Sequence, residues 1–411
     1  MKHRGRHRRR RRGAVLRAVL AGTALALTAA ATMISASQAT VADDPGALQR
    51  LTSPTGADAQ ALAAERVPRG ALDRLSTAMG RPVGIDAVLR GADHTLRSAD
   101  GCSTEEKRAL PVAPAATRAY CFPGADTAAW RPGAVAVSGD GTGRVLASAW
   151  SRGALAKVAF VDASDPGHLA YTWALLALPV DGGRDYRALA SEISGMVWDH
   201  DTLLVTAGPR DRSALYAFDV RRALRADVES AAVGRLPGGW SAAGTRFVLP
   251  AVASYVRVGG AARTSGLGLD RSGARDALAV SEGVPAGEHR PTRLWRYRLG
   301  DDGLPLTDSA GRAVPDAVYT TKATGVRGVL PYGSHWYVAR AGGSADDGRG
   351  MLWRQDADGA RSTACGSDDT HLCWSDPPRS LSYAPATGEL WSQSGTTLFA
   401  VRLTALDSAL R

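Results

Sequence analysis

This chain has few phenylalanines and cysteines, and it lacks the linear motifs that mark many enzymes. Its 411 residues include five Phe and four Cys. The spacings Gly-x-Ser-x-Gly, His-Glu-x-x-His, Gly-x-x-x-x-Gly-Lys-[Ser/Thr] and Cys-x-x-Cys, which encode a nucleophile elbow, a zinc helix, a phosphate cradle and a redox or metal pair, do not occur. These absences argue against several enzyme classes. They do not exclude an enzyme whose site is assembled from separate strands.

The N-terminal apolar run is too short to span a membrane. Ala18 to Ala31 is uncharged and follows a positive n-region at Arg8 to Arg12, whereas a spanning helix needs about 20 apolar residues. Residues 1–39 are therefore predicted to be a signal peptide, cleaved near residue 39 or 42. The general and the twin-arginine export routes both fit the leader. We expect an extracellular, secreted protein without a stable membrane anchor, and association with the cell wall remains open.

The mature chain lacks the basic charge that the whole sequence suggests. The formal net charge is +10, but Lys and Arg in the predicted leader supply nine of these charges without any acid. The mature chain is left with about +1. Because phosphate neutralisation by Lys and Arg dominates affinity for nucleic acid, we expect no nucleic-acid partner.

Four cysteines in an exported chain predict two disulfides. Pairing between sequence neighbours, Cys102 with Cys121 and Cys365 with Cys373, is preferred among three connectivities. A metal site would need closer Cys spacing or histidines nearby. His371, beside Cys373, is the only histidine placed to act as such a ligand, and it is interpreted as a loop residue. We therefore predict no metal and no cofactor.

Residues 43–100 are Ala-rich and show helical spacing of apolar side chains. Leu72, Leu75 and Met79 share one face, and Gly80 and Pro82 break the pattern. The segment is predicted to be a helical N-terminal arm or cap of two or three short helices.

Residues 101–411 change to short runs rich in Val, Leu, Tyr and Trp, separated by Asp, Gly, Pro and Ser turns. Groups of three such runs recur as up-and-down meanders, and their first strands begin at about residues 133, 195, 266, 326 and 380. This repetition is typical of an all-β fold, a β-propeller. We predict about five blades, with six as the alternative. A pair of stacked sheets, as in a β-sandwich, also suits short strands and turns.

Several segments, spread over most of the mature chain, resemble segments of a known protein family. They are Tyr120-Cys121-Phe122, Trp130-Arg131-Pro132-Gly133, Phe160-Val161-Asp162, Ser194 to Trp198, Leu203-Leu204-Val205, Tyr216 to Arg221, Phe247 to Pro250, Leu269 to Ser272, Val326 to Leu330 and Trp336-Tyr337-Val338. In these residues and their order the chain resembles an uncharacterised family of secreted actinobacterial proteins with a β-propeller-like fold. The resemblance implies the fold and export, and it brings no established activity.

The chain departs from the pattern of that family at three places. The family has Pro-Gln-Gly after the first tryptophan, His-Gly-Gly before the second unit and Val-Gln-Gly in the fourth. This chain has Pro132-Gly133, Glu192-Ile193-Ser194-Gly195 and Val326-Arg327-Gly328. If the glutamines and the histidine form a shared channel site in the family, this chain has lost or rebuilt it.

Residues near the ends of innermost strands can face the central channel of a propeller. The candidate channel-lining residues are Trp130, Glu192, Asp270, Arg327 and Arg379. A carboxylate facing two guanidiniums would bind a polar or anionic ligand through charge-assisted hydrogen bonds. An ion-pair network that plugs the channel is the structural alternative.

Other candidate residues have simpler interpretations. Two short polar segments resemble metal or acid–base clusters, namely Asp199-His200-Asp201 and Asp356-Ala357-Asp358-Gly359. Each lies between two predicted strands and is therefore predicted to be a turn. Tryptophans could stack on sugars, and packing between blades is the alternative for each. These candidates are Trp150, Trp173, Trp240, Trp295, Trp353, Trp374 and Trp391.

Two functional hypotheses follow. The first is a secreted, non-enzymatic propeller that binds a ligand, a glycan or a protein partner at its channel face. The second is a propeller hydrolase or lyase in which Glu192, with Asp270 or Glu282, supplies acid and base and Arg327 or Arg379 stabilises an anionic group. An enzyme needs two converging carboxylates in an open pocket.

Overall fold

The computed structural model describes residues 44–51, 60–206, 208, 213–259, 263–342, 348–366 and 370–410. Residues Gly46–Arg411 form one unit and Met1–Pro45 another. The predicted signal peptide, residues 1–39, lies outside the described residues. The following description concerns Gly46–Arg411.

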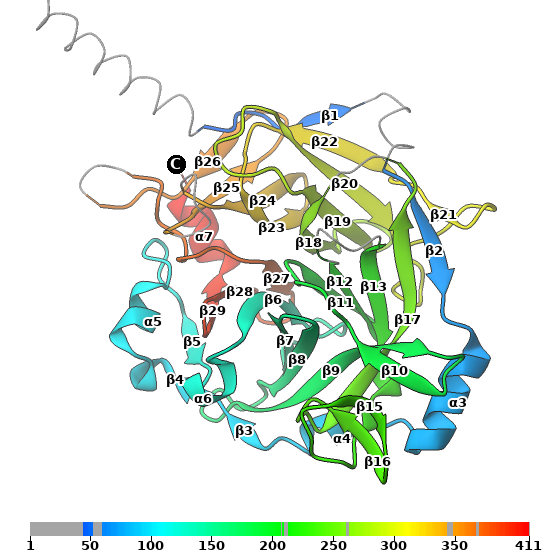
Figure 1. Ribbon diagram of the computed structural model, residues 1–411. Coiled ribbons are helices and arrows are strands. Elements are labelled where there is room, and N and C mark those ends of the chain that lie inside the picture. Colours follow the sequence, from blue (N-terminus) through cyan, green and yellow to red (C-terminus); the bar gives the residue numbers. More distant parts are fainter. Residues whose placement is uncertain are drawn as a thin grey trace, which may run out of the picture. The chain divides into compact units, whose positions relative to one another are not determined.

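Antiparallel meanders of short strands build this unit, as the all-β prediction requires (Figure 1). The first meander comprises β6 (Arg131–Val137), β7 (Val145–Arg152), β8 (Leu155–Asp162) and β9 (Ala170–Val180). The second comprises β11 (Met196–Asp199), β12 (Thr202–Thr206), β13 (Ser213–Asp219) and β17 (Phe247–Arg257).

Three further meanders follow along the chain. The third comprises β18 (Thr264–Asp270), β19 (Ala277–Glu282), β20 (Thr292–Arg298) and β22 (Ala317–Thr321), with β1 (Gln49–Leu51) at its edge. The fourth comprises β23 (Val326–Tyr332), β24 (His335–Arg340), β25 (Met351–Gln355) and β26 (Ala360–Ser362). The fifth comprises β27 (Leu381–Ala384), β28 (Glu389–Ser394), β29 (Thr397–Arg402), β5 (Arg118–Cys121) and β4 (Arg97–Ser98).

Apolar clusters lie between successive meanders and join them in a closed cycle. One cluster contains Ala147 of the first meander and Trp198 of the second, and another contains Trp391 of the fifth and Leu146 of the first. Between the second and third meanders, the cluster includes Leu204 and Leu278. Between the third and fourth it includes Ala279 and Val338, and between the fourth and fifth it includes Tyr337 and Phe399. Because each meander buries both faces against its neighbours, the arrangement is propeller-like.

The first strands of the meanders meet at the centre of this cycle (Figure 1). They approach so closely that several contact positions admit only glycine. A Cβ at Gly195 would lie 2.5 Å from the amide nitrogen of Leu267, and a Cβ at Gly328 would lie 2.6 Å from the carbonyl oxygen of Arg379. Backbone atoms therefore fill the centre at this level, which leaves no room there for side chains.

A serine, instead of a glycine, makes the contact between the first strands of the fifth and first meanders. Ser380 lies just before β27, in the position that corresponds to these glycines, and its hydroxyl accepts a 2.8 Å hydrogen bond from the amide of Val135 in β6. Five pairs of residues therefore make close contacts between neighbouring first strands. The pairs are Gly133 with Ile193, Gly195 with Leu267, Gly266 with Arg327, Gly328 with Arg379 and Ser380 with Val135.

The fifth sheet joins segments from both ends of the described chain. β5 pairs with β29 in antiparallel register, with Ala119 opposite Phe399. A sheet completed by an earlier strand removes the exposed edge that β29 would otherwise present. The short helix α7 (Leu403–Ala409) follows β29 and buries Leu403 and Leu406.

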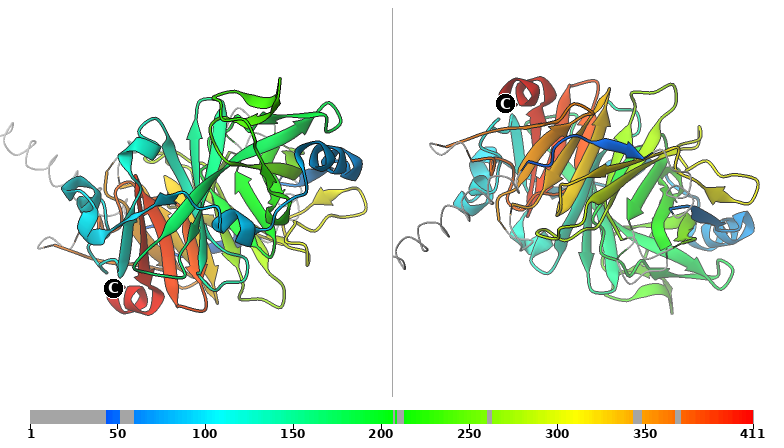
Figure 2. Two further views of the ribbon diagram at one scale, coloured as in Figure 1. Left: turned by 90° about the horizontal axis from the view of Figure 1, so that it is seen from below. Right: turned by 90° about the horizontal axis from the view of Figure 1, so that it is seen from above.

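The N-terminal segment is helical only in part. α3 (Arg69–Met79) and α4 (Ile85–Leu89) lie where the apolar spacing predicts helices. The same segment also supplies strands that extend the sheets, which the sequence pattern did not reveal. β2 (Leu62–Arg66) pairs with β17, and β3 (His94–Thr95) pairs with β9. Figure 2 shows α3 (blue) and α7 (red, at the mark for the C-terminus) outside the layers of strands.

Smaller elements complete the connections. The helices are α5 (Thr104–Arg108), α6 (Gly124–Thr127) and the one-turn helices η1 (Ala99–Gly101) and η2 (Val220–Arg222). The strands are β10 (Asp185–Ala188), β14 (Leu224–Arg225), β15 (Val233–Leu236), β16 (Gly239–Ala242) and β21 (Arg312–Ala313). No helix within the described residues is long and apolar enough to cross a membrane.

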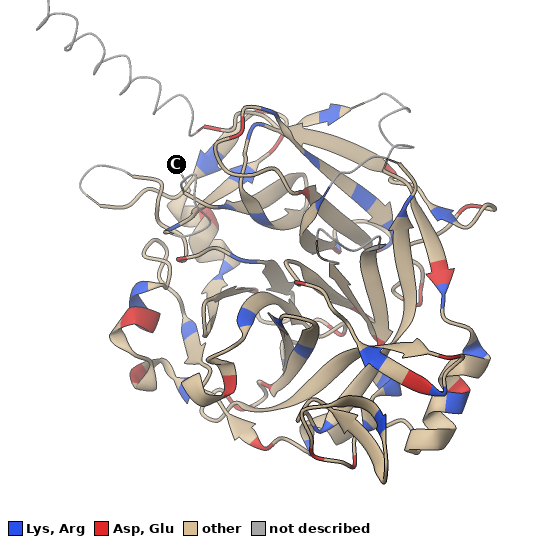
Figure 3. Cartoon of the chain, in the orientation of Figure 1, with Lys and Arg blue, Asp and Glu red and all other residues tan. Residues whose placement is uncertain are grey.

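Charges of both signs are interspersed over the unit in the view of Figure 3. Many form ion pairs at the ends of strands, such as Arg296 with Asp270 at 3.2 Å and Arg290 with Glu282 at 2.7 Å. This distribution agrees with the near-neutral charge expected of the mature chain.

Candidate functional site: a cleft between two diverging strands

A cleft opens where β9 and β17 separate. The two strands pair in parallel from Ala174 to Ala177 and from Phe247 to Pro250. Beyond Pro250, which has no N–H group to continue the ladder, β17 pairs instead with β13 and β2, while β9 turns to pair with β10. The space between the diverging strands has a volume of about 810 Å³.

The lining of the cleft combines charged, hydroxyl and aliphatic side chains. Glu65 from β2, Arg187 from β10 and Glu192 from the segment before β11 line it, together with Ser191 and Ser254. The aliphatic lining residues are Val67, Leu178, Pro179, Val180, Ala190, Ala251, Ala253 and Val256. Carboxylates, a guanidinium and hydroxyls provide both hydrogen-bond donors and acceptors at one cavity.

The two carboxylates of the cleft are held loosely. Glu192 forms a 3.0 Å ion pair with Arg131, and the two side chains are 63% and 78% exposed. Glu65 accepts a 3.4 Å hydrogen bond from the Ser254 hydroxyl. Exposed pairs of this kind contribute little to stability because solvent screens them. Both carboxylates are therefore free to exchange these partners for a ligand.

The cleft contains one of the five channel candidates and two residues that sequence reasoning missed. Glu65 was missed because it lies in a segment predicted to be helical, whereas β2 pairs with β17. Arg187 was missed because β10 branches from β9 outside the meander pattern. An exposed Glu or Arg in a short strand carries no signal that marks it as a site residue.

Trp130 lies just before β6, is half-buried and packs against the apolar cluster between the fifth and first meanders. Its ring lies 4.2 Å from the Lys157 ammonium and 4.7 Å from the Arg152 guanidinium. The Lys157 ammonium also lies 3.4 Å from the Trp173 ring. Trp130 is therefore part of an aromatic and cationic cluster on the first sheet.

Asp270 lies at the opposite end of the first strands from the other four candidates. It ends β18, is buried, and pairs with Arg296. Arg327 and Arg379 lie at the glycine contacts near the strand starts, where their carbonyls approach Gly266 and Gly328. Burial lowers the pKa of Arg327.

Glu282, the other carboxylate considered for acid–base chemistry, is also engaged in ion pairs. It is buried and pairs with Arg290 at 2.7 Å and with Arg293 at 3.3 Å. Asp270 and Glu282 both belong to structural ion pairs, and neither lines the cleft.

The two polar clusters between strands are turns, as predicted. β11 and β12 pair through Asp199 and Thr202, which leaves His200 and Asp201 as a two-residue turn. Asp356 accepts 2.9 Å and 3.1 Å hydrogen bonds from the amides of Asp358 and Gly359 in the turn from β25 to β26. In the second turn the Asp356 carboxylate holds the backbone, whereas in the first the Asp199 and Asp201 carboxylates pair with the side chains of His200 and Arg221.

The seven tryptophans considered as sugar platforms are all buried, at 6% exposure or less. Trp150 contacts Phe122 edge-on, and Trp240 stacks on Tyr186. The interpretation as packing residues is confirmed for these side chains, so a sugar would have to be held chiefly by hydrogen bonds.

Both predicted disulfides are present. Cys102 bonds to Cys121 and Cys365 to Cys373. The Glu106 carboxylate and the sulfurs of Cys102 and Cys121 lie within 4.8 Å of one another, which resembles a metal-ligand group. Sulfurs joined in a disulfide are not thiolates, and only thiolates bind metal strongly. In the oxidised protein this group is structural.

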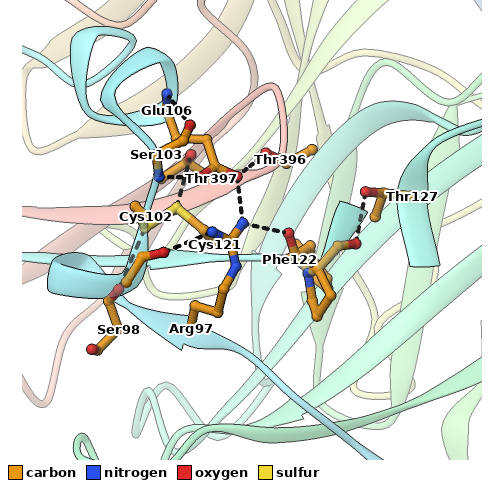
Figure 4. Close-up of polar contacts among 12 residues, drawn as sticks. Arg97, Ser98, Cys102, Ser103, Glu106, Cys121, Phe122, Thr127, Thr396 and Thr397 are labelled. Atoms are coloured by element: carbon orange, nitrogen blue, oxygen red, sulfur yellow. Dashed lines mark hydrogen bonds and ion pairs between the residues drawn. A yellow bond between two sulfur atoms is a disulfide. The ribbon is translucent and has the colours of Figure 1, made fainter. Parts of the chain in front are cut away.

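Glu106 instead connects the disulfide region to the fifth sheet (Figure 4). Its carboxylate accepts hydrogen bonds of 2.7 Å from Arg97, 2.8 Å from Thr396 and 2.6 Å from the Ser103 amide. Burial alone would raise the pKa of Glu106, but the hydrogen bonds from Ser103, Thr396 and Arg97 hold it below its ordinary value.

Comparison with protein-family models finds no match, and comparison with curated proteins finds none. Among solved structures, a gluconolactonase from Xanthomonas campestris matches with 16% identity and a TM-score of 0.32, over 75% of this chain and 97% of that one. Drosophila Plexin A in complex with Semaphorin 1b matches with 7% identity and a TM-score of 0.26, over 87% and 85% of the chains. The description as propeller-like rests on the strand pairing and the cycle of clusters above.

Proposed function

We propose that this protein is an exported, non-enzymatic, five-bladed β-propeller that binds a polyhydroxylated ligand, an oligosaccharide, in the cleft between β9 and β17. The observation that carries this proposal is the cleft of about 810 Å³ that Glu65, Arg187 and Glu192 line together with hydroxyl and aliphatic side chains. Pockets of this size commonly hold small ligands through a few polar groups above apolar walls.

Five blades are supported by the close contacts between first strands. The contacts begin at Gly133, Gly195, Gly266, Gly328 and Ser380, and the last of them returns to the first meander. β5 then serves as the fourth strand of the fifth blade, with the short β4 at its edge, and both join the blade to the N-terminal part of the chain.

An oligosaccharide suits the chemistry of the cleft. Vicinal hydroxyls donate to carboxylates such as Glu65 and Glu192 and accept from the guanidinium of Arg187, and such charge-assisted bonds are the stronger kind. The apolar faces of pyranose rings would lie on half-buried side chains such as Leu178 and Val180. An anion is less suited, because two carboxylates and one guanidinium line the cavity.

Export is supported by the leader and by both disulfides, which form and persist in oxidising compartments. Membership of the secreted actinobacterial family is part of the same proposal. It rests on the motifs around Trp130, Met196 and Val326.

Titration calorimetry on the mature chain, residues 43–411, tests the binding role. The probes are cellobiose, N,N′-diacetylchitobiose and maltotriose. We expect at least one to bind saturably, and Glu192→Gln to weaken its binding about tenfold or more, which corresponds to about 1.4 kcal/mol. The melting temperature should change little because the Glu192–Arg131 pair is exposed.

Glu288→Gln is the matched control. Glu288 also pairs with an arginine, Arg290, at 3.0 Å, with side chains 44% and 47% exposed, and it lies outside the cleft. It should leave binding unchanged. Equal binding by the wild type and Glu192→Gln, or no binding of any probe, would rule out the proposed site.

The enzymatic alternative applies to the same cleft, since two carboxylates line it. A hydrolase or lyase would use Glu65 and Glu192 as acid and base. Incubation of each bound oligosaccharide with the protein, followed by an assay for new chain ends, separates the two functions. New chain ends that disappear in both Glu65→Gln and Glu192→Gln would establish an enzyme.

A further inference from the structure

A second cavity lies at the other end of the first strands, where all five of them end. Its volume is about 310 Å³. The lining residues are Val137 from β6, Trp198 from β11, Leu269, Arg271 and Ser272 at the end of β18, Leu330, Pro331 and Tyr332 from β23, and Ser382, Tyr383 and Pro385 at the end of β27. We call it the axial pocket. It shares no lining residue with the cleft.

Two tyrosines give the axial pocket an aromatic wall. The rings of Tyr332 and Tyr383 meet edge to face, with centroids 5.2 Å apart and planes at 75°. Tyr332 is 37% exposed, which is unusual for a large side chain beside the axis of this unit. An open ring edge of this kind is a surface on which another flat ring can pack in offset or edge-on geometry.

Most of the remaining wall is apolar and rigid. Val137, Trp198 and Leu330 are each at most 3% exposed and belong to the apolar clusters between meanders. The pocket is therefore held open by packed strands. A preformed pocket binds small ligands with a smaller ordering cost in the protein.

The charged group of the pocket is already neutralised. The Arg271 guanidinium donates a 2.9 Å hydrogen bond to the carbonyl of Gly139 and lies 3.4 Å from Asp276 and 3.9 Å from Asp199. It therefore offers little attraction to an anion. Burial, followed by the hydrogen bond with Tyr332, raises the pKa of Tyr383 to about 12, so this phenol stays neutral under physiological conditions.

We propose that the axial pocket is a second ligand site, which takes a small, neutral, aromatic molecule that packs against Tyr332 and Tyr383. The hydroxyls of the two tyrosines supply its polar contacts, and the Ser382 hydroxyl, which accepts a 2.9 Å hydrogen bond from the Val137 amide, can donate its own proton. This site is independent of the sugar cleft, because different residues at the opposite end of the first strands form it.

Ligand-observed NMR and calorimetry on the mature chain test the proposal. The probe is 4-methylphenol, and the charged analogues 4-hydroxybenzoate and tyramine are compared with it. We expect 4-methylphenol to bind saturably and to bind more tightly than either charged analogue. Tyr332→Ala should weaken its binding about tenfold. Tyr319→Ala removes another half-buried tyrosine outside the pocket and should leave binding unchanged.

A crystal soaked with 4-bromophenol keeps the proposal testable even if a tyrosine variant folds poorly, because the bromine locates the molecule in the wild-type protein. Bromine density between Tyr332 and Tyr383 supports the site. Density only elsewhere, stronger binding of 4-hydroxybenzoate, or undiminished binding by folded Tyr332→Ala overturns it.

Discussion

At the scale of single residues, Lys157 is a buried lysine that contacts two aromatic rings. It is 5% exposed and lies between the rings of Trp130 and Trp173. Burial lowers the pKa of Lys157 to about 7, against the opposing attraction of Asp126, whose carbonyl oxygen accepts a 3.3 Å hydrogen bond from the ammonium. The faces of the two rings act in the other direction and favour the charged amine.

This lysine predicts a dependence of stability on pH. Below about pH 7 it is protonated in both states, but between pH 7 and 10 the unfolded chain holds a proton that the folded protein has released. The free energy of unfolding should therefore rise with pH in this range, by up to a few kcal/mol. Lys157→Met should remove most of this rise in urea titrations at pH 6.5, 8 and 9.5. An identical slope in the variant would show that the tryptophan rings keep the amine charged.

At the scale of elements, the first strands are joined by contacts between backbones. Four of the five contact positions carry glycine, and the fifth carries Ser380, which adds hydrogen bonds to Val135. The sequence showed these glycines near the start of four of the five units. It did not show that they touch the next strand, because close approach between strands far apart in sequence leaves no local pattern.

One of these glycines supplies a direct test of the ring. Gly328→Ala would place a Cβ 2.6 Å from the carbonyl of Arg379 and 3.0 Å from Leu381. We expect a loss of about 2 to 3 kcal/mol in the free energy of unfolding, as for an overpacked core. Gly359→Ala, with no atom within 4 Å of the new methyl group, is the control and should be nearly neutral. Equal stability of the two variants in urea would refute the backbone contact.

The closing strand β5 is fastened by the disulfide between Cys102 and Cys121, which are 19 residues apart. Replacing both cysteines by serine should lower the free energy of unfolding by about 3 kcal/mol, because the unfolded chain gains the freedom of that loop. Thermal unfolding of the variant should show lower stability but an unchanged β-sheet spectrum. Removing the disulfide between Cys365 and Cys373, only 8 residues apart, should lower the free energy of unfolding by less. A larger loss from this second disulfide would show that chain entropy does not decide the effect.

At the scale of the whole molecule, the sequence predicted the all-β fold, the meanders and both disulfides. Apolar runs between turn residues indicate strands, and cysteine spacing indicates pairing. The candidate ring around the channel was harder to place. Glu192 reaches a cavity, whereas Trp130 packs against Lys157 and an apolar cluster, and Asp270 lies at the opposite end of its strand. The order of strands follows from the sequence pattern. The cavity or cluster that a given side chain reaches depends on the register between strands, which the pattern does not show.

The cleft itself could not be predicted, because it depends on how two strands of different meanders separate. β17 pairs first with β9 and then with β13, and β2 arrives from the N-terminal segment. Glu65 and Arg187 come to the cavity through these pairings, which are far apart in the chain.

The most direct test of the account is a crystal structure of the mature chain, residues 43–411, soaked with the oligosaccharide that binds most tightly in calorimetry. The account predicts sugar density between β9 and β17, with hydroxyls within hydrogen-bond distance of Glu192 or Glu65. An empty cleft in crystals that hold the sugar elsewhere would contradict it.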